Sequence, residues 1–359
     1  MVTTPLVTRV GPDLHTGGRI VPIFRITALT GAFVAVALAV WEANRLGASP
    51  RVELALCLGA MLTFLALAFV TQAIVGREVL IYYHHEIAVL VVTATACLVA
   101  GVDAPGRYLD ATALGLGACL AIGRLGCLAA GCCHGRPGRR GVVYGEHYAS
   151  HFPPSLLGVR LVPAPAIESA LVAAIVVTGL ALVADGAVPG AAFVFYVDAY
   201  AVVRFFLEEL RGDSTRRYAH GLSEAQWISL SLVLGTALLA LAGVTPGGAL
   251  TLVAPALLGA AAAVLVLRAR RGRGDVLHPR HARELAGLAQ APAPRATSLG
   301  VVVSRGDEHW SLSRRPRPLS QLEATVLAEQ LVAVRRPEGP PPQVVRGTAD
   351  VFHVLLPEP

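Results

Sequence analysis

Long apolar runs alternate with short polar breaks along most of this 359-residue chain. An α-helix that spans a lipid bilayer needs about 20 predominantly apolar residues. Eight runs approach that length, and we expect seven or eight of them to be membrane-spanning helices. Their ranges are 21–40, 54–75, 87–102, 109–130, 165–183, 190–210, 227–244 and 249–267.

The pattern changes at Arg268, where an arginine-rich stretch begins a polar tail. The tail contains a Pro/Ala linker near Ala291, and the rest predicts strands at 299–303 and 343–356 and a helix at 320–334. Ser320 and Glu323 form a capping box at the start of that helix. These short elements predict a small folded unit.

We therefore expect an all-α polytopic membrane protein with seven to eight transmembrane helices and a small soluble αβ C-terminal tail. The predicted division is a transmembrane domain at 1–268 and a linker with a small soluble region at 269–359. Because domains joined by such linkers separate easily, truncation near Ala291 is expected to leave the bundle folded.

Composition agrees with a membrane protein. Hydrophobic residues make up 54% of the chain and charged residues 15%, against about 25% charged residues in average soluble domains. The net charge is +6, and all 30 basic residues are arginine. Aromatic residues are not interleaved with the basic segments, so we expect anionic lipid rather than nucleic acid as the partner.

Two arginines, Arg124 and Arg204, lie inside apolar runs. An arginine at the centre of a membrane helix costs at least about 2.5 kcal/mol, so such residues usually mark a site. A guanidinium matches phosphate or carboxylate with two parallel hydrogen bonds, which indicates a bound anionic group. The alternatives are that Arg124 caps neighbouring carbonyls and that Arg204 extends its charge to the membrane interface.

A polar stripe surrounds Arg204. Tyr200, Arg204 and Glu208 are spaced four residues apart, and Arg211 follows. Residues at this spacing share one face of a helix. The spacing predicts a polar stripe through the bundle interior; the alternative is that Glu208 and Arg211 lie at the membrane interface.

A histidine pair precedes the third apolar run, within the sequence Tyr82-Tyr83-His84-His85-Glu86. A histidine near a reacting group can act as a general base close to neutral pH. The other interpretation is an aromatic and polar belt at the membrane interface.

Three cysteines, Cys127, Cys132 and Cys133, form the only cluster of that residue type. They could bind metal, undergo redox chemistry or pack. Their spacing lacks a second cysteine pair, so it does not meet the zinc pattern, and we expect no metal and no cofactor. The nearby glycines predict space for a lipid headgroup beside the backbone; they are Gly123, Gly126, Gly131 and Gly135.

These segments resemble the signatures of bacterial prolipoprotein diacylglyceryl transferases. The first resemblance is Gly123-Arg124-Leu125-Gly126 followed by Gly131 and Gly135-Arg136-Pro137; the second is Tyr200, Arg204, Glu208 and Arg211 with Ser223 and Gln226 downstream. His84 falls where the family has its histidine, and Glu168 keeps the frame of a family glutamate. Cys127 and Cys132 stand where the family has asparagine and glutamate. The resemblance covers about residues 20–245 and indicates a divergent branch with a Gly-Cys-Cys signature.

The resemblance implies transfer of a diacylglyceryl group from phosphatidylglycerol to the lipobox cysteine of a prolipoprotein signal peptide, in the bacterial inner membrane. It implies catalytic roles for His84, Arg124, Arg204 and Glu208, with His84 as the base and Glu208 orienting Arg204. It also implies that Tyr200 and Arg211 bind substrate. Two alternatives are an enzyme of the same scaffold with another acceptor and a non-catalytic membrane module that binds lipid.

Overall fold

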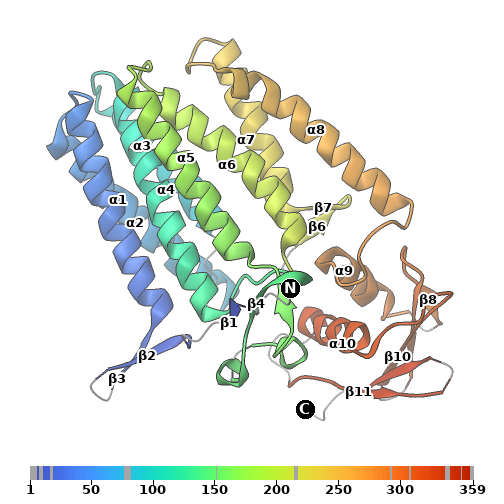
Figure 1. Ribbon diagram of the computed structural model, residues 1–359. Coiled ribbons are helices and arrows are strands. Elements are labelled where there is room, and N and C mark those ends of the chain that lie inside the picture. Colours follow the sequence, from blue (N-terminus) through green and yellow to red (C-terminus); the bar gives the residue numbers. More distant parts are fainter. Residues whose placement is uncertain are drawn as a thin grey trace.

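The computed structural model describes residues 6–7, 11–16, 19–76, 82–150, 152–213, 217–291, 293–306, 309–335, 340–348 and 350–355. Within these residues, eight long helices lie side by side as a bundle (Figure 1). They are α1 (Ile23–Arg45), α2 (Pro50–Val75), α3 (Tyr82–Val99), α4 (Pro105–Ala130), α5 (Ala164–Ala184), α6 (Ala191–Leu207), α7 (Glu224–Leu241) and α8 (Ala249–Arg270).

All eight predicted apolar runs are helical. Among the described residues, seven helices are long and apolar enough to cross a membrane. The remaining one, α6, has 17 residues and continues into the 3-10 turn η3 (Glu208–Leu210). The third helix begins at Tyr82, five residues before the predicted start, so the histidine pair lies inside α3.

Helix α4 is the centre of the bundle, since it contacts α1, α2, α3, α5 and α6. Small residues allow this close packing. A Cβ placed on Gly115 would lie 2.7 Å from the carbonyl oxygen of Ala35 on α1. Asp110 of α4 also caps α6, because its carboxylate accepts hydrogen bonds from the backbone N–H groups of Gly190 and Phe193, both at 2.7 Å.

The polar parts of the chain gather at one end of the bundle, which we call the polar end (Figure 1). They comprise the hairpin of β2 (Asp13–Thr16) and β3 (Arg19–Pro22), the segment 131–163 and the C-terminal tail. The segment 131–163 contains β4 (Pro137–Val143), the 3-10 turns η1 (Glu146–Tyr148) and η2 (Pro154–Leu156), and β5 (Arg160–Leu161). Strand β4 pairs with β5 and with β1 (Leu6–Val7). A short hairpin, β6 (Tyr218–Ala219) and β7 (Leu222–Ser223), precedes α7.

The tail is a small αβ unit, as predicted, and it contains more elements than the sequence indicated. Its five-stranded antiparallel sheet has the order β11-β12-β10-β9-β8. The elements are α9 (Pro279–Leu288), β8 (Arg295–Ala296), β9 (Val301–Arg305), β10 (His309–Arg314), α10 (Gln321–Arg335), β11 (Gln343–Arg346) and β12 (Phe352–Leu355). Ser320 and Glu323 form the predicted capping box.

The tail shares one hydrophobic core with the segment 131–163. Tyr144, Tyr148 and Phe152 belong to the same buried cluster as Leu327 and Leu331 of α10. Polar contacts reinforce this core: Ser155 N–H and Oγ–H donate to the carboxylate of Glu329, at 2.9 and 2.5 Å. The core therefore crosses the predicted division at residue 268, and that division remains a prediction.

Candidate functional site

Arg124 lies in the last two turns of α4 and is buried between helices. Its Nε is 2.9 Å from Oε2 of Glu168 on α5. The hydroxyl of Tyr200 on α6 donates to the other oxygen of Glu168 at 3.0 Å. Glu168 is 1% exposed, so this pair joins three helices in a place that water does not reach. The contact with a carboxylate replaces the carbonyl-capping role considered for Arg124.

Arg204 is buried on α6, three residues before the helix ends. Its Nη2 is 2.7 Å from Oε2 of Glu208, which confirms the pair expected from their spacing. The guanidinium carbon lies 5.9 Å from the centre of the Tyr83 ring. Nε and Nη1 of Arg204 have no hydrogen-bond partner among the described residues. Buried donors are usually satisfied, so these two are available to a ligand.

Arg211 follows η3 and is 1% exposed. Its Nε is 2.8 Å from Oδ1 of Asp213, and neither Nη1 nor Nη2 has a hydrogen-bond partner in the described part of the chain. Arg211 and Arg204 are close enough to affect each other electrostatically, and both act on Glu168. The expected convergence of buried arginines therefore includes a third guanidinium.

Backbone hydrogen bonds join the two signature segments. The N–H of Gly212 donates to the carbonyl of His134, and the N–H of Arg136 donates to the carbonyl of Leu210. Gly135 and Arg211 form an antiparallel bridge between them. A Cβ on Gly135 would lie 2.3 Å from the carbonyl oxygen of Val162. Glycine is therefore required here by close backbone packing.

The other three glycines have different surroundings. Gly131 ends α4 in a left-handed conformation, with φ of +73°. A Cβ on Gly126 would collide with Thr27 of α1, whereas one on Gly123 would meet nothing within 4 Å. Packing and backbone conformation thus give a reason for Gly126 and Gly131, whereas Gly123 borders open space and its contact with a lipid headgroup stays a prediction.

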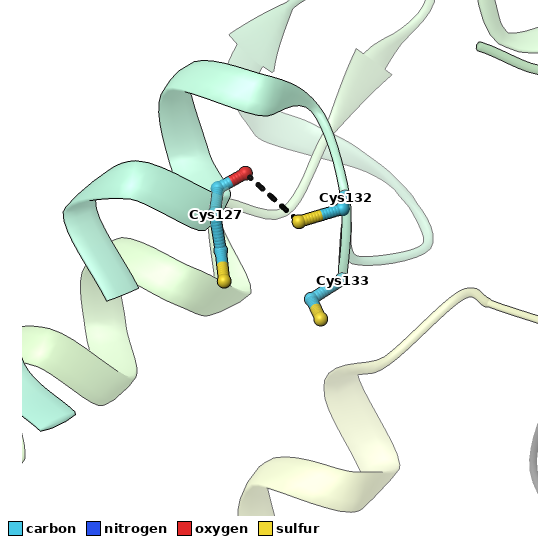
Figure 2. Close-up of side chains that lie close together, drawn as sticks. All are labelled: Cys127, Cys132 and Cys133. Carbon is cyan, nitrogen blue, oxygen red and sulfur yellow. Dashed lines mark hydrogen bonds between the residues drawn. The ribbon is translucent and has the colours of Figure 1, made fainter. Parts of the chain in front are cut away.

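The three cysteines come together at the end of α4 (Figure 2). Their Sγ atoms all lie within 4.8 Å of one another. Arg124 Nη1 is 3.9 Å from the sulfur of Cys127 and 3.8 Å from that of Cys133. Hydrogen bonds from the thiols of Cys127 and Cys132, with the charges of Arg211 and Arg124, hold the pKa of Cys133 well below its usual value, although burial opposes this shift.

His84 is predicted to act as a base near the buried arginines, but its side chain contacts a glutamate of another helix. Its Nε2 is 2.9 Å from Oε1 of Glu224 at the start of α7, and both side chains are 38% exposed. Among the described residues, no hydrogen bond or ion pair joins His84 to Arg124 or Arg204. His85 is buried against the ring of Phe64, at 4.4 Å between centroids. The role of His84 as base remains a prediction.

Two buried carboxylates stand out that the sequence did not assign to the site. Glu168 holds Arg124, and Glu86 of α3 accepts a hydrogen bond from the hydroxyl of Tyr196 on α6. The sequence signal for both residues is a glutamate within an apolar run, because an unpaired carboxylate in a membrane helix costs free energy. The partners lie on other helices, so spacing along the chain does not reveal them.

A narrow cleft, open to solvent, lies between α3, α6 and α7. Arg204, Tyr200 and Glu86 line it together with apolar side chains such as Leu90, Val197 and Leu232. An apolar cleft with a few convergent polar groups is the usual form of a small-molecule site. Here an acyl chain can lie along the apolar wall while an anionic group reaches Arg204.

Comparison with known proteins agrees with this geometry. The profile of the prolipoprotein diacylglyceryl transferase family matches residues 15–242. A curated phosphatidylglycerol–prolipoprotein diacylglyceryl transferase of Dehalococcoides mccartyi is 34% identical over 130 residues, which are 36% of this chain and 48% of that protein. The match thus spans about half the length of that relative. Because the family profile covers more than half of the chain, this protein belongs to the prolipoprotein diacylglyceryl transferase family.

Proposed function

We propose that this protein transfers a diacylglyceryl group from phosphatidylglycerol to the lipobox cysteine of a prolipoprotein signal peptide, as a multi-pass protein of the bacterial inner membrane. The observation that carries the proposal is the pair of buried guanidinium groups, Arg204 and Arg211, each of which has two nitrogen donors without a hydrogen-bond partner among the described residues. Arg204 also lines the apolar cleft. Buried cations beside an apolar cleft fit a phospholipid, which is anionic at one end and apolar at the other.

The reaction forms one bond and breaks another. The acceptor thiol loses its proton, and its sulfur attacks the glyceryl carbon that carries the phosphate. The carbon–oxygen bond breaks, and the electron pair leaves with the phosphate oxygen as glycerol phosphate. Negative charge develops on that phosphate in the transition state, where Arg204 and Arg211 stabilise it. Preorganised donors in a site that excludes water are the largest source of such stabilisation.

Two buried glutamates hold the arginines of the site in place. Glu208 fixes Arg204 through the pair at 2.7 Å. Glu168 fixes Arg124 and in turn receives the hydroxyl of Tyr200. Arg124 contacts Glu168 and two cysteine sulfurs, whereas Arg204 and Arg211 each have two nitrogens without a hydrogen-bond partner among the described residues. We therefore assign Arg124 to positioning Glu168 and the cysteines, and we assign the leaving phosphate to Arg204 and Arg211.

The test is transfer by the full-length protein, in detergent with phosphatidylglycerol, to a peptide that carries a lipobox cysteine. Arg204→Ala and Arg211→Ala are each expected to lower the rate by about 10²–10³-fold, the loss typical for one transition-state donor. Lysine should restore little, because it lacks the planar pair of donors. Arg51→Ala, an exposed arginine at the other end of the bundle, is the matched control.

Full activity in both alanine variants would refute the phosphate clamp. Binding of phosphatidylglycerol without transfer by the unaltered protein would refute the transferase and favour a lipid-binding module.

A further inference from the structure

The arrangement of Cys127, Cys132 and Cys133 depends on a sharp reversal of the chain. Helix α4 ends at Ala130, Gly131 takes a left-handed conformation, and Cys133 takes one as well, with φ of +56°. This conformation costs a residue with a side chain roughly 1–2 kcal/mol. The reversal returns Cys132 and Cys133 to the last turn of α4, where Cys127 lies (Figure 2).

The sulfur positions suit a single metal ion. Zinc binds thiolate sulfur at about 2.3 Å, so three sulfurs on one ion lie about 3.8–4.0 Å apart. The three Sγ atoms already lie within 4.8 Å of one another. A small closing movement of the side chains would therefore complete the coordination. Cysteines that merely pack, such as Cys57 and Cys97 on α2 and α3, lie outside this group.

Two buried arginines lie beside the cysteine cluster. Three thiolates and one divalent ion carry a net charge of −1. Arg124 Nη1 is within 3.9 Å of two of the sulfurs, and the charge of Arg211 acts on Cys133. Hydrogen-bond donors next to ligating atoms orient the ligands and tune the metal. Two buried cations therefore offset the charge that such a site carries.

We propose that Cys127, Cys132 and Cys133 bind a thiophilic divalent metal ion of the zinc class and leave its fourth position open for an acceptor thiol. Structural zinc sites have four protein ligands, whereas catalytic sites have three and an exchangeable position. Within the described residues, the group that could hold a metal contains these three ligands alone. Cys132 is exposed, so the site can be reached from the polar end.

The second half of this inference rests on the proposed function. An acceptor thiol that takes the fourth position displaces water and is deprotonated by the metal, and its proton goes to solvent. The thiolate would then attack the glyceryl carbon, the carbon–oxygen bond would break with its electron pair leaving on glycerol phosphate, and the thioether product would dissociate from the three cysteines. The metal keeps its oxidation state throughout. This step would supply a thiolate without a part for His84, which contacts Glu224.

The first experiment measures metal directly, without activity. Full-length protein in detergent, reduced and loaded with cobalt(II), is expected to bind one ion per chain and to show a thiolate-to-cobalt charge-transfer band that zinc abolishes. Cys132→Ser, at the exposed position, should weaken binding at least tenfold without disturbing the bundle, and Cys127→Ser and Cys133→Ser should do the same. Cys57→Ser and Cys97→Ser are the controls, since each retains all three ligands.

The second experiment adds a lipobox peptide to the cobalt-loaded protein. A shift of the ligand-field bands with the cysteine peptide, absent with its serine analogue, supports the open position. An unchanged spectrum overturns it. Absence of the charge-transfer band, or equal binding by the cysteine variants, overturns the metal site. Because metal binding is measured on the protein alone, either failure is distinct from failure of the transfer reaction.

Discussion

At the scale of single residues, charge inside an apolar run is the signal that could be read from the sequence. Arg124, Arg204 and Glu208 were predicted because an unpaired charge is expensive in a membrane helix, and the pair of Arg204 with Glu208 is confirmed at 2.7 Å. Spacing along one helix reveals such a pair. The partner of Arg124 is Glu168 on α5, and contacts between helices are set by packing that no local pattern encodes.

Glu168→Gln tests the buried pair that joins α4 to α5. The amide cannot neutralise Arg124, so a buried cation is left without its counter-charge. Breaking a buried ion pair by removing one partner costs about 3–5 kcal/mol. We expect a clear loss of stability on thermal unfolding in detergent, together with loss of transfer.

Glu284→Gln in the tail is the control, because that exposed carboxylate contacts Ser298 rather than the bundle. Equal unfolding temperatures for Glu168→Gln and the unaltered protein would show that the Glu168–Arg124 pair contributes little to the fold.

The proximity of the three cysteine sulfurs depends on the backbone conformation, which their spacing in the sequence does not reveal. Their spacing gave no zinc pattern, and we expected no metal. The reversal at Gly131 and the left-handed Cys133 bring the sulfurs together. The zinc spacing rule looks for two cysteine or histidine pairs along the chain. It does not describe a helix end followed by left-handed residues, here Gly131 and Cys133.

At the scale of elements, the eight helices could be predicted because each is a long apolar run with breakers at its ends. The tail was predicted less completely. Helix α9 has ten residues and strand β10 has six, and such short elements have a weak periodic signal. Helix α9 is also stabilised at its start by His278, whose side chain accepts from the N–H of Arg280 at 3.1 Å.

Two glycine-to-alanine variants separate helix propensity from helix packing. Alanine favours a helix interior over glycine by about 1 kcal/mol. Gly59→Ala on α2 meets nothing within 4 Å and is expected to stabilise the protein slightly. Gly115→Ala places its Cβ 2.7 Å from the carbonyl oxygen of Ala35 and is expected to separate α4 from α1 and destabilise the protein. Thermal unfolding of both variants gives the comparison, and the same sign for both would contradict the close packing of α4.

At the scale of the whole molecule, the candidate site lies where the bundle and the polar end meet. The hydroxyls of Tyr144 and Tyr148 donate to the carbonyls of Leu128 and Ala129 at the end of α4, at 3.0 and 2.7 Å. The same two rings belong to the core shared with the tail. The end of α4 that carries the cysteines is thus tied to the C-terminal unit through two tyrosines.

A second link joins the tail to the end of α6. Glu209 accepts from Arg280 of α9 at 3.2 Å and lies 3.5 Å from Nε2 of His278. Burial raises the pKa of Glu209, but the hydrogen bond and charge of His278 and the charge of Arg280 outweigh it and lower this pKa to about 2. The carboxylate is therefore ionised at neutral pH and holds α9 against the bundle.

Truncation at Ala291 is expected, on these contacts, to disturb the site, in contrast to the expectation from the linker composition. The truncated chain keeps α9 but loses α10 and the sheet, and with them Leu327 and Leu331 from the shared core. Tyr144, Tyr148 and Phe152 then face solvent, and the segment 131–163 loses its packing. We expect new protease cleavage within that segment, mapped by mass spectrometry, while the membrane helices stay protected.

Two full-length variants separate loss of the docking contact from loss of the tail. Glu329→Gln weakens the hydrogen bonds to Ser155 and should raise cleavage of the segment partially, since a neutral acceptor replaces a charged one. Arg346→Ala removes an exposed pair with Asp350 and should leave cleavage unchanged, because exposed ion pairs contribute little. If the truncated protein protects residues 131–163 as well as the full chain does, the segment folds on the bundle alone and the tail is a separate domain.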